Sequence, residues 1–200
     1  MSSSTRDGTG RGYRARVTQD KRLSTNAVTE SVVQFGAIRG DTYNLATSPI
    51  SITGSTETAL FYLKNLDEQD LLISSIFINT VNGAGTISGQ PTLNIFRNPI
   101  AGLIVDNQTD ISVISNNNFG TNLFPNVNAY EGVDGSTFTS FNLTIPVPLP
   151  TRAAVPFLEF NTVVVLERGS TYGISYQPES GSTSVDVITG CIATVLPKEF

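Results

Sequence analysis

The sequence of 200 residues contains no histidine, no tryptophan and a single cysteine. The absence of histidine excludes Ser-His-Asp and Cys-His catalysis, and it excludes zinc sites with imidazole ligands. A glycosidase would need two acids across a cleft, and most acidic residues of this chain lie in predicted turns. The composition therefore predicts a protein that is not an enzyme and that uses no cofactor and no metal ion.

The single cysteine, Cys191, has no partner for an internal disulfide and lies in the apolar run VITGCIATV. A nucleophilic thiolate would need a neighbouring Lys or Arg in a chain without histidine. A free cysteine in such a run packs as a small apolar side chain. We expect Cys191 to be buried and inert.

Long apolar runs are also missing, since no stretch approaches 18 consecutive apolar residues. The beginning of the chain, MSSSTRDG, lacks the apolar segment of a signal peptide. These features predict a soluble protein that is made in a reducing cytoplasm and does not enter a membrane.

Charged residues are few, at 14% of the chain, and they are unevenly distributed. Residues 1–39 hold seven basic and three acidic residues, a net charge of +4. Residues 40–200 hold five basic and fourteen acidic residues, a net charge of −9. The sequence therefore predicts a basic N-terminal arm, residues 1–31, attached to an acidic body, residues 32–200.

The arm includes the stretch RDGTGRGYRARVTQDKRL, with six basic side chains, three glycines and almost nothing to bury. Its basic residues could contact nucleic-acid phosphates, and its tyrosine could stack on a base, but the charge of the body opposes wrapping by nucleic acid. Because the arm cannot order itself by burial, we expect it to dock on an acidic protein surface or on another copy of the chain. The candidate docking residues are Arg6, Arg11, Tyr13, Arg14, Arg16, Lys21 and Arg22.

From residue 31 onward, runs rich in Val, Ile, Phe, Tyr and Thr alternate with turn-forming clusters of Gly, Asn, Asp and Pro. Several runs alternate apolar and polar residues, which is typical of a sheet with one buried face. The stretch AVTESVVQFGA is predicted to be a strand because it is rich in β-branched residues. About nine strands with irregular connections predict an all-β fold, a two-sheet β-sandwich of jelly-roll or Greek-key type with an extended N-terminal arm.

Four segments carry more specific expectations. The glycine-rich NGAGTISGQ lacks the lysine of a phosphate loop and is predicted to be a hairpin connection. Residues 98–136, rich in Asn and Gly, are expected to form a long excursion with one modest strand. In STFTSFNLTI, a slip in the alternation at Thr139–Ser140 predicts a bulge. The prolines of IPVPLPTRAAVP predict an edge strand or an extended bridge.

Three short motifs have both a functional and a simpler interpretation. The tripeptide Arg-Gly-Asp at residues 39–41 matches that of integrin-binding loops, but we expect a turn with the glycine at positive φ. The acid pairs Asp106 with Asp110, and Glu131 with Asp134, lack the spacing of a calcium loop and are interpreted as hydrated turns.

Three strand motifs, ETALFYLKNLDEQDLLISSI, TLNIFRNPIAG and LERGSTYGISYQP, follow one another along the chain. In this order they resemble the virion proteins of tailed bacteriophages, in particular the small β-sandwich proteins that decorate or cement the capsid. The resemblance covers roughly Glu57 to Ile192. It departs at Asn65-Leu66, where Asn-Pro is usual in the family, and this departure affects a turn.

The resemblance implies a structural role on the capsid exterior of a virion. Subunits of such proteins, often trimeric, bind the outer capsid lattice and clamp neighbouring major capsid subunits. The expected partners are therefore the major capsid protein and other copies of this chain in a homotrimer. The arm would lie along a seam between capsomers, where repeated weak contacts add up.

Two alternatives stay open. The chain could be another virion component, such as a single jelly-roll capsid subunit, a head or tail fibre base, or a tail adaptor. It could also be a carbohydrate-binding β-sandwich module, whose candidate contacts would be the aromatic residues Phe119, Phe124 and Tyr130.

Overall fold

A computed structural model of the chain describes residues 16–17, 23–24, 31–101, 109–111, 113–118, 125–150 and 158–196. The chain divides into two compact units, Met1–Ser31 and Val32–Phe200. In the first unit, strand β1 (Arg16–Val17) pairs antiparallel with strand β2 (Leu23–Ser24). The fold described below is that of the second unit.

The first sheet of the second unit has six strands. They are β3 (Thr42–Ala46), β4 (Ile50–Thr53), β6 (Leu71–Ser88), β10 (Val113–Asn116), β14 (Leu158–Leu166) and β16 (Ser180–Val195). Their order is β10-β3-β16-β6-β14, all antiparallel, with β4 also paired to β16. Since β3 and β4 pair with successive parts of β16, they form one interrupted strand along its edge.

The second sheet also has six strands. They are β5 (Thr58–Asn65), β7 (Thr92–Arg97), β9 (Thr109–Asp110), β11 (Val127–Glu131), β13 (Leu143–Pro148) and β15 (Thr171–Gln177). Their order is β13-β7-β15-β5-β11-β9, again antiparallel. A separate short pair is formed by β8 (Ile100–Ala101) and β12 (Phe138–Thr139).

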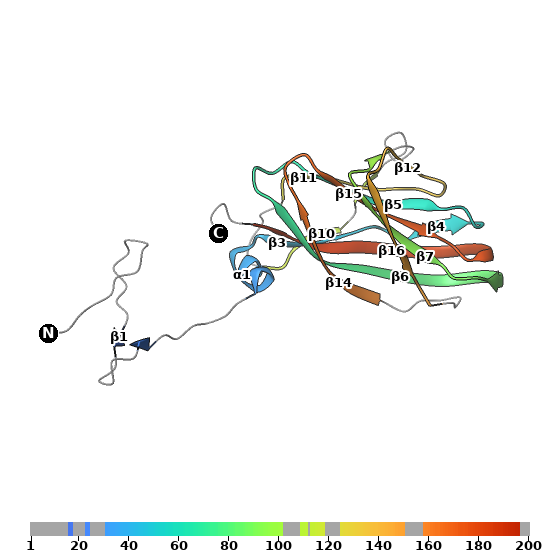
Figure 1. Ribbon diagram of the computed structural model, residues 1–200. Helices are drawn as coiled ribbons and strands as arrows, with labels where there is room; N and C mark the ends of the chain where they lie inside the picture. The colour runs from blue at the N-terminus through green and yellow to red at the C-terminus, as the bar shows by residue number, and fades with distance from the viewer. Residues whose placement is uncertain are drawn as a thin grey trace. The chain divides into compact units, whose positions relative to one another are not determined.

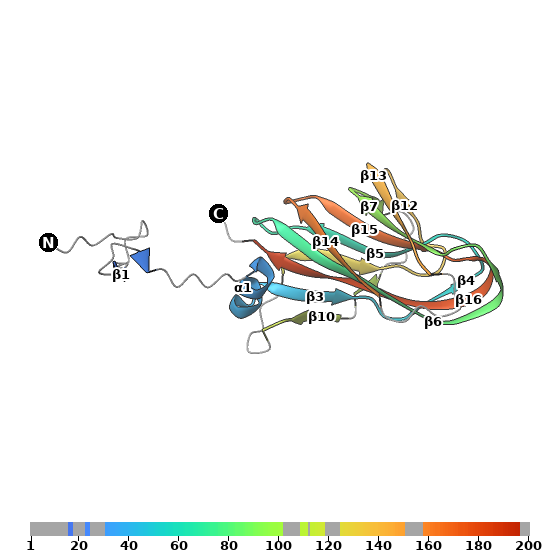
Figure 2. The same ribbon diagram turned by 60° about the horizontal axis from the view of Figure 1, so that its bottom comes forward.

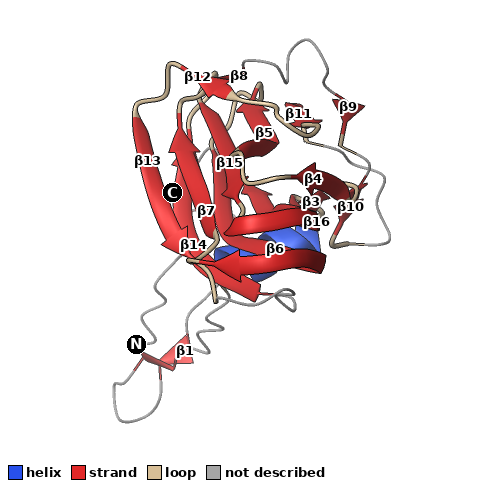
Figure 3. Cartoon of the chain, turned by 90° about the vertical axis from the view of Figure 1, so that its right-hand side faces the viewer, coloured by secondary structure: helices blue, strands red, loops and turns tan. Residues whose placement is uncertain are grey.

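The core lies between the two sheets, which form two layers (Figures 1 and 3). Alternate side chains of each strand face the other sheet, as a period of two requires. Fully buried side chains come from both layers and include Leu45, Ile73, Ile76, Ile78, Phe61, Leu63, Leu93 and Ile174. The prediction of an all-β two-sheet sandwich is confirmed, while its jelly-roll or Greek-key wiring stays a prediction.

Strands β6 and β16 run side by side over most of their lengths (Figure 2). Their pairing extends from Val195 opposite Leu71 to Ser180 opposite Ser88. The segment NGAGTIS therefore continues β6, and the prediction of a hairpin connection there is wrong. Backbone hydrogen bonds between β6 and β16 do not depend on side chains. Pairing with β16 therefore keeps this segment extended, although glycine has a low intrinsic preference for strands.

Within the described residues, the α-helix α1 (Val32–Arg39) stands where we predicted a strand over AVTESVVQFGA. That prediction is wrong because a tertiary contact overrides the weak preference of β-branched residues. A Cβ atom on Gly36 would lie 2.5 Å from Cγ2 of Thr194 and 2.6 Å from Oγ1 of Thr42. Glycine thus allows α1 to approach β3 and β16 closely at one end of the first sheet (Figure 1).

The Arg-Gly-Asp tripeptide ends this helix. Gly40 has a φ of 84°, and the amide of Asp41 donates to the carbonyl of Gly36 at 2.7 Å, as in a Schellman cap. The Arg39 and Asp41 side chains pair at 3.1 Å. The predicted turn with glycine at positive φ is confirmed, and it closes a helix.

The segment of residues 98–136 contains more structure than the one strand that we expected. Its described residues form β8, β9, β10 and β11, and they contribute to both sheets because β10 pairs with β3 and β11 with β5. The slip at Thr139–Ser140 is a break between β12 and β13, with Ser140 at a φ of 51°, and not a bulge. Strand β13, with Pro146 and Pro148, lies at a sheet edge as predicted.

Candidate functional site

The predicted docking residues of the arm fall mostly outside the described residues. Those outside are Arg6, Arg11, Tyr13, Arg14, Lys21 and Arg22, whereas Arg16 belongs to β1. No described surface brings them together, so their role stays a prediction.

Cys191 is fully buried in the core, as predicted. Burial raises the pKa of its thiol to about 12. The reactive thiolate is therefore not populated near neutral pH, and Cys191 is not a candidate nucleophile.

The acid pair Glu131 and Asp134 holds the interrupted strand in place. Oε2 of Glu131 accepts a hydrogen bond from the backbone amide of Ser48 at 2.6 Å, between β3 and β4. Asp134 accepts hydrogen bonds from the amide and the hydroxyl group of Thr53 at the end of β4. Both carboxylates are structural acceptors. The interpretation of this pair as a hydrated turn is wrong for Glu131, which is buried at the end of β11, whereas Asp134 lies in an exposed turn. In the part of the chain that the structure describes, no group of three metal-binding side chains is found.

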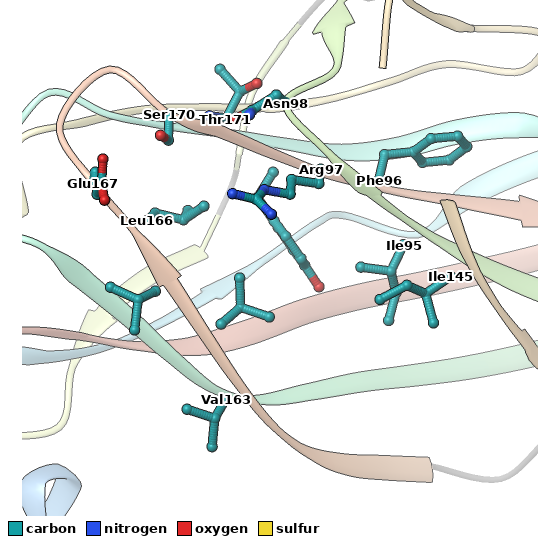
Figure 4. Close-up of a pocket in the computed structure, with 13 residues that line it drawn as sticks. Ile95, Phe96, Arg97, Asn98, Ile145, Val163, Leu166, Glu167, Ser170 and Thr171 are labelled. Atoms are coloured by element: carbon teal, nitrogen blue, oxygen red, sulfur yellow. Dashed lines mark hydrogen bonds between the residues drawn. The ribbon is translucent and has the colours of Figure 1, made fainter. Parts of the chain in front are cut away.

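A groove of about 370 Å³ lies between the edge strand β14 of the first sheet and strands β7, β13 and β15 of the second. We call it the inter-sheet groove. Figure 4 shows Ile95 and Ile145 at one end, Glu167 and Ser170 at the other, and Arg97 between them. Its walls are thus apolar at one end and polar at the other.

Exposed apolar side chains border the inter-sheet groove. Val163 is 81% exposed, and Val165 and Ile145 are about half exposed. Strand β14 ends the first sheet, so its outer backbone groups pair with no other strand among the described residues. An apolar patch beside an open strand edge is suited to contact with an extended polypeptide segment.

Tyr172 also borders this groove, but its hydroxyl group is buried and has no hydrogen-bond partner among the described residues. Burial, and to a lesser extent the nearby Cys191, raises the pKa of Tyr172 well above its ordinary value of 10.0. The phenol therefore stays protonated, and its lost hydration costs free energy.

A second hollow, of about 380 Å³, lies on the outer face of the second sheet, and we call it the outer groove. Oε1 of Glu57 accepts hydrogen bonds from Nδ2 of Asn94, at 2.7 Å, and from the Ser175 hydroxyl group. Asn94 and Ser175 stand opposite each other in β7 and β15. The register of the sheet therefore fixes the orientation of this carboxylate.

Aromatic rings form the other wall of the outer groove. Phe96 packs edge-on against Phe138 and Phe141, with centroid separations of 5.1 and 4.8 Å. Phe96 is buried, whereas Phe141 is 47% exposed. The outer groove thus combines a carboxylate, an amide and hydroxyl groups with aromatic surface, a composition typical of small-ligand sites.

Sequence reasoning missed the outer groove and named other aromatic residues for a carbohydrate contact. Phe119 and Phe124 lie outside the described residues. Tyr130 stacks on Tyr62, with a separation of 6.1 Å between the ring centroids. One signal was available: Phe138 and Phe141 stand among small polar residues in STFTSFNLTI.

The comparisons with known proteins give no assignment. No protein-family model matches the chain, and no curated protein matches it. None of the described residues forms a helix with the length and apolar character needed to span a membrane.

Proposed function

We propose that this chain is a structural virion protein that binds the outer surface of a tailed-bacteriophage capsid and cements neighbouring major capsid subunits. The basic arm is the docking strap, and the β-sandwich is the body on the capsid exterior. The three strand motifs that resemble phage decoration proteins support this proposal, and so does the β-sandwich fold that carries them.

The division of charge along the chain is the observation that carries the proposal. The net charge is +4 over residues 1–39 and −9 over residues 40–200. Along the sequence, the boundary between the two compact units follows residue 31, close to this change of charge. Arginines of the arm can form bidentate hydrogen bonds with carboxylates of a partner, and glycines let the backbone follow its surface closely. Repetition over a capsid lattice would make such weak contacts effective.

The inter-sheet groove offers a second contact. The exposed Val163, Val165 and Ile145 would be covered by an extended segment of a capsid subunit added to the open edge of β14. The strap would supply electrostatic attraction and the groove apolar burial. A homotrimer would present both features three times.

Deletion of residues 1–30 tests the role of the arm. In particles assembled with the truncated chain, we expect lower occupancy of the protein and a lower Tm of the particle. Unchanged occupancy together with an unchanged Tm would refute the proposed strap.

Matched variants separate charge from chain length. Replacing Arg6, Arg11, Arg14, Arg16 and Arg22 by glutamine keeps the arm but removes its arginine charge, so occupancy should approach that of the truncated chain. Replacement by lysine keeps the charge but removes the bidentate fork, so occupancy should be intermediate. Equal occupancy for glutamine, lysine and arginine arms would contradict an electrostatic strap.

Copy number separates cementing from a role as a tail adaptor or a fibre base. A gel of purified particles should show this chain in amounts comparable to the major capsid protein. A few copies per particle would instead indicate a tail adaptor or a fibre base.

A further inference from the structure

We propose that the outer groove binds a neutral saccharide, with Glu57 accepting hydrogen bonds from sugar hydroxyl groups and Phe141 packing against the sugar ring. The groove lies on the body and does not involve the arm. This site therefore goes beyond the cementing role and can be tested on the isolated protein, whatever the outcome of the particle experiments.

Glu57 presents an oriented acceptor. Its Oε1 takes both hydrogen bonds, from Asn94 and Ser175, and within the described chain Oε2 takes none. The ion pair found among the described residues joins Arg39 and Asp41, so no cation there neutralises Glu57. A half-buried carboxylate held in one orientation is a strong acceptor for ligand hydroxyl groups.

Further hydroxyl groups line the same hollow. Thr137 is exposed, and Thr144, half-buried, stands opposite Phe96 in the pairing of β13 with β7. Threonine hydroxyl groups both donate and accept, as sugar hydroxyl groups do. The polar side of the groove thus matches a ligand with several neighbouring hydroxyl groups.

Phe141 supplies the apolar side. Phe96 holds it edge-on, at 4.8 Å and an interplanar angle of 66°, and the ring is 47% exposed. The C–H groups of a pyranose are weakly positive and are attracted to the negative face of an aromatic ring. Ser140, which precedes Phe141, has a φ of 51°, and such backbone strain in a residue other than glycine is concentrated at functional sites.

The charge of the groove disfavours an anionic ligand. Its described lining contains Glu57 and no Lys or Arg, so the carboxylate of a sialic or uronic acid would be repelled. A quaternary ammonium ion prefers several open aromatic faces, whereas here Phe96 is buried and Phe138 is half-buried. A neutral sugar needs one open ring and hydroxyl partners, which is what the outer groove provides.

Ligand titration of the full chain tests the site. The probes are the methyl glycosides of glucose, galactose, mannose and N-acetylglucosamine, with N-acetylneuraminic acid and tetramethylammonium as charged comparisons. Saturation-transfer and chemical-shift measurements should show weak, saturable binding of at least one neutral glycoside, with shifts at Glu57 and Phe141. Binding of a charged probe alone, or of no neutral glycoside, would overturn the proposal.

Two variants locate the binding. Glu57→Gln keeps the size of the side chain and removes the second carboxylate oxygen, and Phe141→Ala removes the exposed ring. Each should weaken binding about tenfold, a loss of about 1.4 kcal/mol, whereas Val163→Ala at the inter-sheet groove should leave it unchanged. Because Phe141 is half exposed, its variant should fold even if Glu57→Gln does not. Binding that survives in folded Phe141→Ala at the affinity of the unmodified chain would refute the assignment.

Discussion

The Cζ atom of Phe138 lies 2.7 Å from the position that a Cβ atom would take on Gly173. Phe138 belongs to β12 and Gly173 to β15, so an aromatic ring packs directly on the backbone of the second sheet. The centroid of this ring lies 5.1 Å from that of Phe96 and 6.5 Å from that of Tyr62. Gly173 therefore positions the aromatic wall of the outer groove.

Gly173→Ala should displace the Phe138 ring and lower the free energy of unfolding by about 1–3 kcal/mol, the usual cost of overpacking. Chemical denaturation measures this change. The double variant Gly173→Ala with Phe138→Ala should show partial compensation, because the added methyl group then has room. An unchanged stability for Gly173→Ala alone would contradict the observed contact.

Tyr172→Phe should raise the free energy of unfolding by about 1 kcal/mol, because it removes a buried hydroxyl group without a partner. Tyr172→Leu should lower stability, since it also removes the ring packed edge-on against Phe61 at 6.4 Å. A loss of stability in Tyr172→Phe would mean that the hydroxyl group is satisfied by a bound water.

Stability should fall at alkaline pH. Burial raises the pKa of Cys191 from 9.0 to about 12, and burial together with Glu179 raises that of Tyr176 from 10.0 to about 12. In the unfolded chain both groups ionise earlier than in the folded chain. Their stabilising contribution is therefore complete below about pH 9 and is lost towards about pH 12, at roughly 1.4 kcal/mol per pH unit for each group.

Cys191→Ala serves as the control for this pH dependence. Without the thiol, the fall should begin near pH 10, where the unfolded tyrosine ionises. Urea denaturation at a series of pH values measures both profiles. Parallel profiles for the two proteins between pH 9 and pH 10 would exclude the thiol as the cause.

Glu131→Ala should cost about 1–3 kcal/mol, because it leaves the amide of Ser48 without its side-chain acceptor. Glu131→Gln keeps an acceptor oxygen and should cost less. Thermal unfolding of the two variants measures the difference. Equal losses of stability in the two variants would show that the hydrogen bond does not stabilise the connection between β3 and β4.

Salt should weaken docking of the arm. Raising the ionic strength from about 0.1 M to about 1 M shortens the Debye length from about 10 Å to about 3 Å. Increasing salt should therefore release the protein progressively from the particles, and sedimentation measures the fraction that stays bound. Retention at about 1 M would indicate that apolar contacts of the body, and not the arm, hold it.

The sheets were predictable where the pattern is local. TYGISYQ alternates apolar and polar residues and forms β15, and the β-branched run of FNTVVVLERG lies in β14. The helix α1 and the end of β6 were not predictable, because they depend on distant contacts. Gly36 of α1 packs closely against Thr194 of β16, which is distant in sequence. Ser88, at the end of β6, pairs with Ser180 of β16.

The outer groove was hidden from sequence reasoning for the same reason. Glu57, Asn94 and Ser175 belong to three separate segments, and the hydrogen bond between Glu57 and Ser175 spans 118 residues. Nothing local marks Glu57 as an oriented acceptor. The strand register that aligns β7 with β15 creates the site, and a single sequence does not reveal this register.

The proposed cementing role is best tested by an image reconstruction of phage particles assembled with this chain. We expect density for the β-sandwich on the outer capsid surface, bridging neighbouring major capsid subunits, with the arm extending along a seam between them. Density for the chain only in the tail or inside the capsid, or no density for it in the particle, would contradict the cementing role.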